Sequence, residues 1–63
     1  MIKTGDRFTA RHKQLPSYTY EFVGINPDDS RGGIVLRNIA LNEETCVEVE
    51  WFRQREITLA KNK

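Results

Sequence analysis

Short runs of alternating apolar and polar residues recur along this chain, and turn residues separate them. In the first run, Phe8 and Ala10 share one side while Arg7, Thr9 and Arg11 share the other. Such a period of two is typical of half-buried strands. Apolar positions at helical spacing do not persist over ten or more residues, so the pattern predicts an all-β fold. The expected strands span residues 6–12, 18–25, 34–39 and 45–51, with a short last strand at Ile57 and Leu59.

The second expected strand, YTYEFVGI, changes face in its middle. Tyr20 and Phe22 lie on one side, whereas Val23 and Ile25 fall on the other, with Gly24 between them. A bulge or sharp bend at Gly24 turns both apolar sets towards the same core. The sequence therefore predicts a bulge at this glycine.

Two connections are expected to be turns. Residues 26–33 are dense in Asn, Pro, Asp, Ser and Gly, which favour turns. The next connection is expected to be a hairpin centred on Asn42 and Glu43, which places Arg37 across from Glu48. This register puts one pair of opposite charges on the outer face.

The stretch EVEWFRQREITL raises the question of whether its two adjacent aromatics are buried or offered to a partner. Trp51 continues the alternation of Val47 and Val49, so it is expected in the core. Phe52 cannot share that strand face unless the chain has already turned. We expect a short turn in which Phe52 folds over the open end of the core.

The order of four strands, a connection too short for a full helix and a short last strand resembles the SH3-like small barrel family, which includes Tudor-like and KOW-like modules. The resemblance runs from Gly5-Asp6-Arg7-Phe8 through Trp51-Phe52-Arg53-Gln54-Arg55 to Leu59. The chain is also similar to small uncharacterised bacterial or prophage proteins that open with a Gly-Asp pair and an aromatic. The resemblance implies a single domain over residues 1–63: a small five-stranded SH3-like barrel with a 3₁₀ turn before the last strand and a frayed tail from about residue 60. The basic, glycine-centred motif of KOW modules is absent after the first strand.

Composition indicates a folded domain of marginal size. The chain has 63 residues, 30% of them charged, and a net charge of +1. A domain this small buries only about 60% of its unfolded surface, so a homodimer stays open as a source of further burial. The single cysteine, Cys46, excludes an internal disulfide, and no apolar run is long enough to span a bilayer. We expect a cytoplasmic protein without membrane insertion.

Candidate catalytic and metal-binding residues are few. His12 and Cys46 are the sole residues of their types, and nothing in their spacing brings them together. A nucleophile needs a base that a third group orients, and zinc needs four ligands, so neither set can be assembled. Asp28, Asp29 and Ser30 lack the spacing of a calcium loop and are interpreted as a turn. The sequence predicts no enzyme, no metal site and no cofactor.

Basic residues gather near the two ends of the chain, and glutamates near its middle. If the first and last strands are neighbours, their arginines converge with Lys3 and Lys13 on one surface. The guanidinium group suits phosphate and carboxylate equally well. The alternative interpretation is an ordinary solvated surface, partly neutralised by Asp6 and Glu56. The expected contact residues are Arg7, Arg11, Arg53 and Arg55 with the tyrosines Tyr18 and Tyr20, of which Tyr18 is the more exposed.

The charge pattern favours a non-catalytic binding or adaptor module that docks a charged protein partner. The alternative is a nucleic-acid module, RNA or DNA, in which the tyrosines stack on bases between the arginines. The sequence pI of about 7.9 is low for such a module, and Arg31-Gly32-Gly33 is a lone triplet. In a third interpretation the protein is a small inhibitor whose acidic side chains imitate phosphates; these are Glu43, Glu44, Glu48 and Glu50.

Overall fold

The structure, a computed structural model, describes residues 2–28, 30 and 32–60. The tail residues 61–63, Asp29 and Arg31 lie outside this range, so the expectations about them stay predictions. The described elements are β1 (Arg7–Arg11), β2 (Tyr18–Ile25), β3 (Ile34–Asn38), β4 (Glu43–Val47), α1 (Val49–Arg53) and β5 (Glu56–Leu59).

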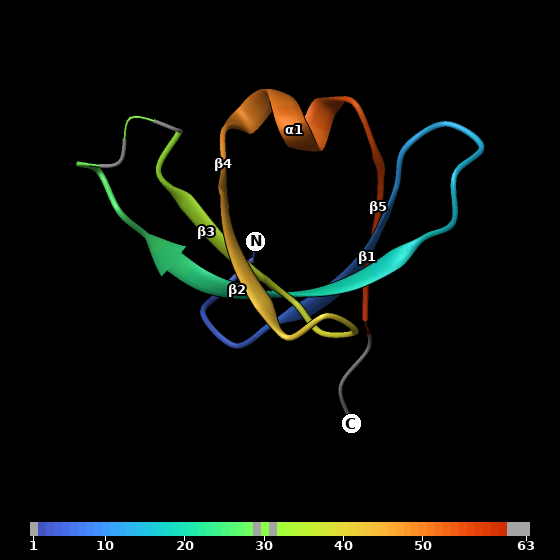
Figure 1. Cartoon of the computed structure of the whole chain (residues 1–63), viewed down its shortest axis with the longest axis horizontal. Helices are drawn as coiled ribbons and strands as arrows, with labels where there is room; N and C mark the ends of the chain where they lie inside the picture. Colours follow the sequence, from blue (N-terminus) through green and yellow to red (C-terminus); the bar gives the residue numbers. More distant parts are fainter. Residues whose placement is uncertain (1, 29, 31, 61–63) are drawn as a thin grey trace.

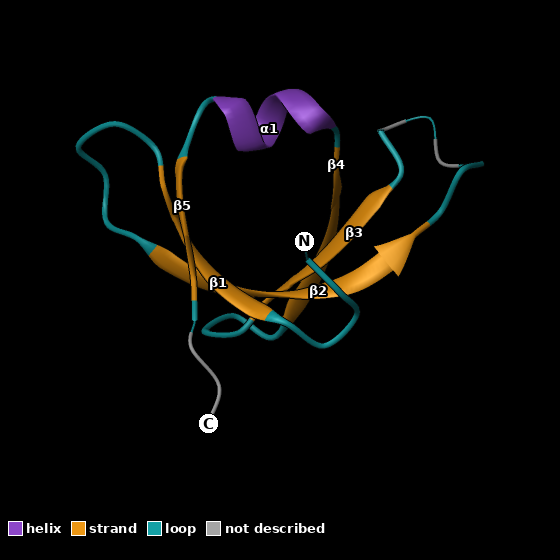
Figure 2. Cartoon of the chain, turned by 180° about the vertical axis from the view of Figure 1, so that it is seen from behind, coloured by secondary structure: helices purple, strands orange, loops and turns teal. Residues whose placement is uncertain are grey.

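The strands form one antiparallel sheet in the order β4-β3-β2-β1-β5. The first four strands follow one another as a meander, and β5 returns to pair with β1. The sheet curves strongly, so that β4 and β5 rise on opposite sides and α1 spans the gap between them (Figure 1). The view from behind in Figure 2 shows the same arrangement. The predicted all-β class is confirmed.

The core lies on the concave side of the sheet. Its buried members are Phe8, Ala10, Leu36 and Val47, of which Phe8 and Leu36 have no exposed surface. The alternation in β1 explains this directly, since Phe8 and Ala10 point inward while Arg7, Thr9 and Arg11 point outward. Complete burial of one such large side chain contributes about 1.5–3 kcal/mol.

The predicted bulge in β2 is confirmed. Phe22 pairs with Leu36 and Gly24 with Val35, so Val23 is the extra residue between two ladder pairs. The bulge increases the local twist and bends the sheet. Phe22, before the bulge, packs against the core, whereas Ile25, after it, is 62% exposed, so the expectation that both apolar sets turn inward is wrong for Ile25.

The predicted register of the β3–β4 hairpin is wrong. Arg37 lies across from Glu44, not from Glu48, and the ladder closes with Asn38 opposite Glu43. The turn thus sits two residues earlier in the chain than expected.

Side-chain capping explains where this turn forms. Asn38 is largely buried, and its Oδ1 accepts a hydrogen bond from the Leu41 backbone N–H at 3.1 Å. Asn42 ends the turn in the left-handed region, with φ of 55°, which asparagine tolerates better than most residues. The observed register differs from the predicted one by an even number of residues. Each side chain of β4 therefore lies on the face predicted for it, and Val47 points into the core.

The connection from β4 to β5 differs from the expected one. β4 ends at Val47 and α1 follows, so the predicted strand over residues 45–51 is too long and the predicted 3₁₀ turn is a five-residue α-helix. Its first bond, from the Trp51 N–H to the Glu48 carbonyl, spans three residues, whereas the Gln54 N–H reaches back four to Glu50. The helix therefore begins with 3₁₀ geometry and tightens the turn.

Four aromatic rings link α1 to the sheet. Phe8 stacks on Tyr20 at 5.8 Å between ring centroids, Tyr20 meets the edge of Trp51 at 5.2 Å, Trp51 meets Phe52 at 5.0 Å, and Phe52 returns to Phe8 at 5.8 Å. We call these four residues the aromatic cluster. Both helix aromatics are partly buried against the core, as expected, whereas Val49 is 57% exposed because the change from strand to helix turned it outward.

The loop after β2 contacts the start of α1 through a glycine. Gly32 has φ of +127°, and a Cβ added there would lie 2.6 Å from the Glu48 backbone nitrogen. Gly5 also has positive φ, +94°, but nothing lies within 4 Å of its added Cβ. Gly24 has neither constraint. Comparing alanine substitutions at these three glycines therefore distinguishes the cost of backbone strain from the cost of a steric clash.

We expect Gly32→Ala to lower the free energy of unfolding by roughly 2–4 kcal/mol, since it adds a backbone clash to conformational strain. Gly5→Ala should cost only about 1–2 kcal/mol, because it carries the strain alone. Gly24→Ala should change stability by less than about 1 kcal/mol. Urea unfolding followed by circular dichroism measures all three. Equal losses at Gly32 and Gly5 would contradict the packing described here.

Candidate functional site

Basic side chains from three parts of the chain meet where β1 ends and β5 begins. Antiparallel pairing sets Arg11 opposite Glu56. Arg53 stands in the last turn of α1, and Arg55 lies between α1 and β5. With Lys13, just beyond β1, they line an open cleft of about 330 Å³. We call it the basic cleft: Arg11, Lys13, Arg53, Gln54, Arg55 and Glu56.

Arg7, a further expected contact residue, lies apart from the basic cleft. It stands at the opposite end of β1 from Arg11, roughly 13 Å away at strand spacing. On the outer face it belongs to a row of alternating charges across four strands, in which Arg7 faces Glu21, Glu21 faces Arg37 and Arg37 faces Glu44. In this row the Arg37 and Glu21 side chains form an ion pair at 3.6 Å. Arg7 therefore lies beside a carboxylate of the sheet itself.

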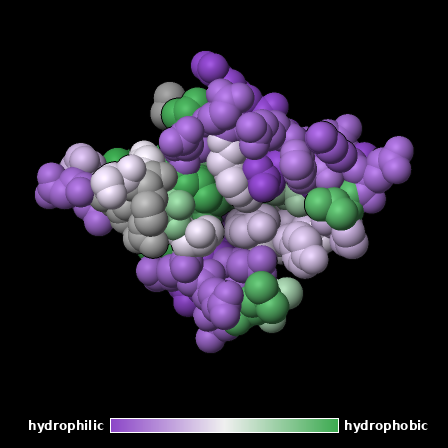
Figure 3. Space-filling view, turned by 45° about the horizontal axis from the view of Figure 1, so that its top comes forward, coloured by the Kyte–Doolittle hydropathy of each residue, from purple (hydrophilic) through white to green (hydrophobic). Residues whose placement is uncertain are grey.

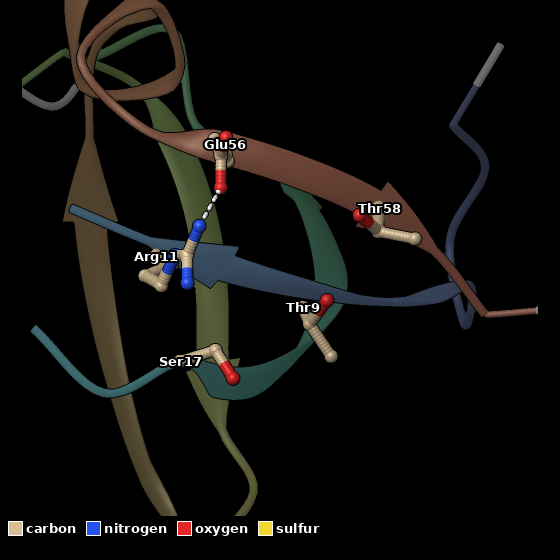
Figure 4. Close-up of a pocket in the computed structure, with 5 residues that line it drawn as sticks. All are labelled: Thr9, Arg11, Ser17, Glu56 and Thr58. Carbon is tan, nitrogen blue, oxygen red and sulfur yellow. Dashed lines mark hydrogen bonds and ion pairs between the residues drawn. The ribbon is translucent and has the colours of Figure 1, made fainter. Parts of the chain in front are cut away.

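Arg11 is held by the acidic member of the cleft. Its Nη2 donates to Glu56 Oε1 at 2.5 Å, across β1 and β5 (Figure 4). Hydroxyl side chains of Thr9, Ser17 and Thr58 line the same part of the outer face. Because the two charged side chains are 50% and 73% exposed, water screens the pair, and it contributes at most about 1 kcal/mol to stability.

Arg55 is the most constrained cation of the cleft. Its Nη1 donates to the Trp51 carbonyl oxygen at 3.0 Å, and its guanidinium carbon lies 4.3 Å from the centroid of the Trp51 ring. These two contacts orient the flat guanidinium group and leave less side-chain entropy to lose on binding. By contrast, Arg53 has one long ion pair with Glu50, 3.9 Å, and its side chain is 72% exposed.

The two tyrosines occupy different environments. Tyr18 is 44% exposed and lies beside the loop that follows β1. Tyr20 is partly buried, and Phe8 and Trp51 pack against its ring. Tyr18 is thus available to a partner, whereas the ring of Tyr20 belongs mainly to the core.

The sequence interpretation missed two features of this site. The first is the contact of Arg55 with Trp51. These residues are four apart, a spacing that brings side chains together on an α-helix, but a 3₁₀ turn was expected here. The second is a recess that Leu15 and Pro16 form with Tyr18. The available signal was the apolar pair Leu15-Pro16 in an otherwise polar loop, which was interpreted as a strand break.

The residues considered for chemistry do not meet in one place. His12 follows β1, whereas Cys46 lies in β4, and two strands of the sheet separate these elements. Within residues 2–28, 30 and 32–60, no group of three or more His, Cys, Asp or Glu side chains could hold a metal ion. The described part of the chain also contains no helix with the length and apolar character needed to cross a membrane.

Comparisons with known proteins found no matching family model and no similar curated protein or solved structure. The function is therefore inferred from the geometry of the site.

Replacing Arg55 by lysine should expose Trp51, because an ammonium group cannot cover the ring and bond its carbonyl in one plane. We expect a red shift of the tryptophan emission and a loss of about 0.5–1.5 kcal/mol in stability. Since Trp51 is the single tryptophan, the spectrum is assigned without ambiguity. Arg53→Lys is the matched control and should change neither quantity measurably. Identical emission from both variants would contradict the stacked arrangement.

Proposed function

We propose that this protein is a non-catalytic binding module whose basic cleft docks an acidic segment of a protein partner. The convergence of Arg11, Lys13, Arg53 and Arg55 from separate elements carries this proposal. Guanidinium groups bind carboxylates with two parallel hydrogen bonds, and Arg55 is already oriented by Trp51. The positive charges of the cleft would attract an acidic segment, and the oriented guanidinium of Arg55 would fix the position of one carboxylate.

We also propose that the sheet is an SH3-like small barrel. A meander of four strands, a fifth strand that pairs with the first and a single helical turn between β4 and β5 support it. A fold of this kind presents loops and side chains on a stable frame, but function depends on the site.

Two observations favour a protein partner over nucleic acid. First, two carboxylates lie in or beside the cleft: Glu56 lines it, and Glu50 pairs with Arg53. A long polyanion that extends beyond the cleft meets these charges at distances within the screening length of roughly 8 Å in cellular salt. Second, Tyr20 packs in the core, so a single exposed tyrosine remains for base stacking. An acidic peptide carries fewer and more widely spaced negative charges, so these carboxylates repel it less, and its binding does not depend on base stacking.

The arrangement of the acidic residues 43, 44, 48 and 50 does not favour the alternative function, an inhibitor whose carboxylates imitate a row of phosphates. β4 ends at Val47, so Glu48 and Glu50 do not continue the strand that carries Glu43 and Glu44. Glu44 also lies opposite Arg37. The four carboxylates therefore do not follow one strand at regular spacing.

The test uses a fluorescein-labelled twelve-residue peptide of alternating Glu and Gly, with a twelve-nucleotide single-stranded DNA as the competing probe. We expect the peptide to bind in low salt, measured by fluorescence anisotropy. The double variant Lys13→Gln, Arg53→Gln should weaken binding by about tenfold, equivalent to 1.4 kcal/mol. Arg7→Gln, which removes one positive charge outside the cleft, should change affinity less than about twofold.

Three results would overturn the proposal. The peptide does not bind at any salt concentration, the double variant binds as well as the unmodified protein, or the DNA binds more tightly than the peptide with a steep dependence on salt. The last result would assign the cleft to nucleic acid, since release of counterions from phosphates produces that slope.

A further inference from the structure

A small recess adjoins the basic cleft. Leu15 and Pro16, in the loop between β1 and β2, form one wall, and Tyr18 lies beside them. Buried Ala10 and the side chain of Arg55 also line it. Its volume is about 120 Å³. A cavity of roughly 150 Å³ holds one benzene molecule, so the recess has the size of a single apolar side chain.

The loop that forms the wall has a defined conformation. A turn closes it, in which the Leu15 N–H donates to the His12 carbonyl at 3.1 Å and Lys13 adopts φ of 58°. Pro16 then restricts the backbone that follows. The recess therefore belongs to the folded loop and does not require a partner to create it.

Two exposed apolar side chains line the recess. Leu15 is 58% and Tyr18 44% exposed, and both line the recess. Other exposed apolar residues, such as Ile25 and Leu41, stand on other elements. On the face towards α1, Figure 3 shows apolar residues as small separate areas within a largely hydrophilic surface. A partner gains apolar burial here only through an individual side chain.

Arg55 connects the recess with the basic cleft, since its side chain lines both. A ligand that places a carboxylate on Arg55 therefore lies next to both the recess and the cleft that Lys13 and Arg53 line. We infer that the partner segment is an extended acidic peptide with one aliphatic or aromatic side chain that enters the recess.

This inference rests on the proposed function and adds a rule for selectivity. Exposed charges steer an acidic segment and orient it, but they distinguish poorly between one acidic sequence and another. A side chain buried in a fitted pocket discriminates by shape and size. The basic cleft thus selects acidic segments as a class, and the recess selects among them.

Two labelled peptides of equal length and charge test the inference: the Glu and Gly peptide with a central leucine, and the same peptide with a central serine. We expect the leucine peptide to bind about tenfold more tightly, a difference of 1.4 kcal/mol. In Leu15→Ser the ratio should fall below about two, because the wall of the recess is lost, while affinity for the serine peptide stays unchanged.

Leu41→Ser is the matched control. Leu41 is 61% exposed against 58% for Leu15, and it lies in the turn between β3 and β4. The same substitution there should preserve the tenfold ratio. Thermal unfolding of both variants verifies that the fold is intact.

The outcomes separate this inference from the proposed function. If both peptides bind the unmodified protein equally, and both depend on Lys13 and Arg53, the cleft stands and the recess inference is overturned. A preference for leucine that survives Leu15→Ser overturns it as well. If neither peptide binds, the proposed function itself is overturned.

Discussion

The packing of four aromatic rings closes this small protein, and the rest of the structure depends on it. The edge strands β4 and β5 rise on opposite sides of the curved sheet and belong to opposite ends of the strand order, so hydrogen bonds between strands do not hold the open side together. Phe8 and Tyr20 from the sheet and Trp51 and Phe52 from α1 form a closed set of contacts across that opening. In a chain that buries so little surface, a few large side chains must supply much of the apolar contact.

The same packing positions the candidate site. The Trp51 ring packs against Tyr20 and Phe52, and the guanidinium carbon of Arg55 lies 4.3 Å from its centroid. Arg55 is therefore oriented by the core, although it lines the basic cleft and the recess. The pair of Arg55 and Trp51 belongs both to the core packing and to the candidate site, so the most constrained cation of the basic cleft lies directly on the aromatic cluster.

Periodicity predicted which face each strand buries, but not which residues become partners. The alternation in residues 18–25, with Gly24 at the change of face, was sufficient to predict β2 and its bulge. The β3–β4 register failed because a buried Asn38 side chain caps the turn, a tertiary contact that no period of two encodes. Proximity in sequence also joined Arg7 to Arg11, whereas the length of β1 separates them. The recess was missed because it forms between a loop and a strand brought together by folding.

The ion pair of Arg11 and Glu56 places a carboxylate of the protein itself inside the basic cleft. The guanidinium group has five N–H donors and bonds Glu56 through Nη2, so a second carboxylate can still bond to it but lies close to the negative charge of Glu56. In the proposed complex, Glu56 therefore repels a carboxylate that approaches Arg11, whereas Lys13 and Arg53 hold no comparably short ion pair among the described residues. If the proposed docking occurs, Glu56 lowers the gain from Arg11, and the attraction of an acidic segment depends mainly on the other cations of the cleft.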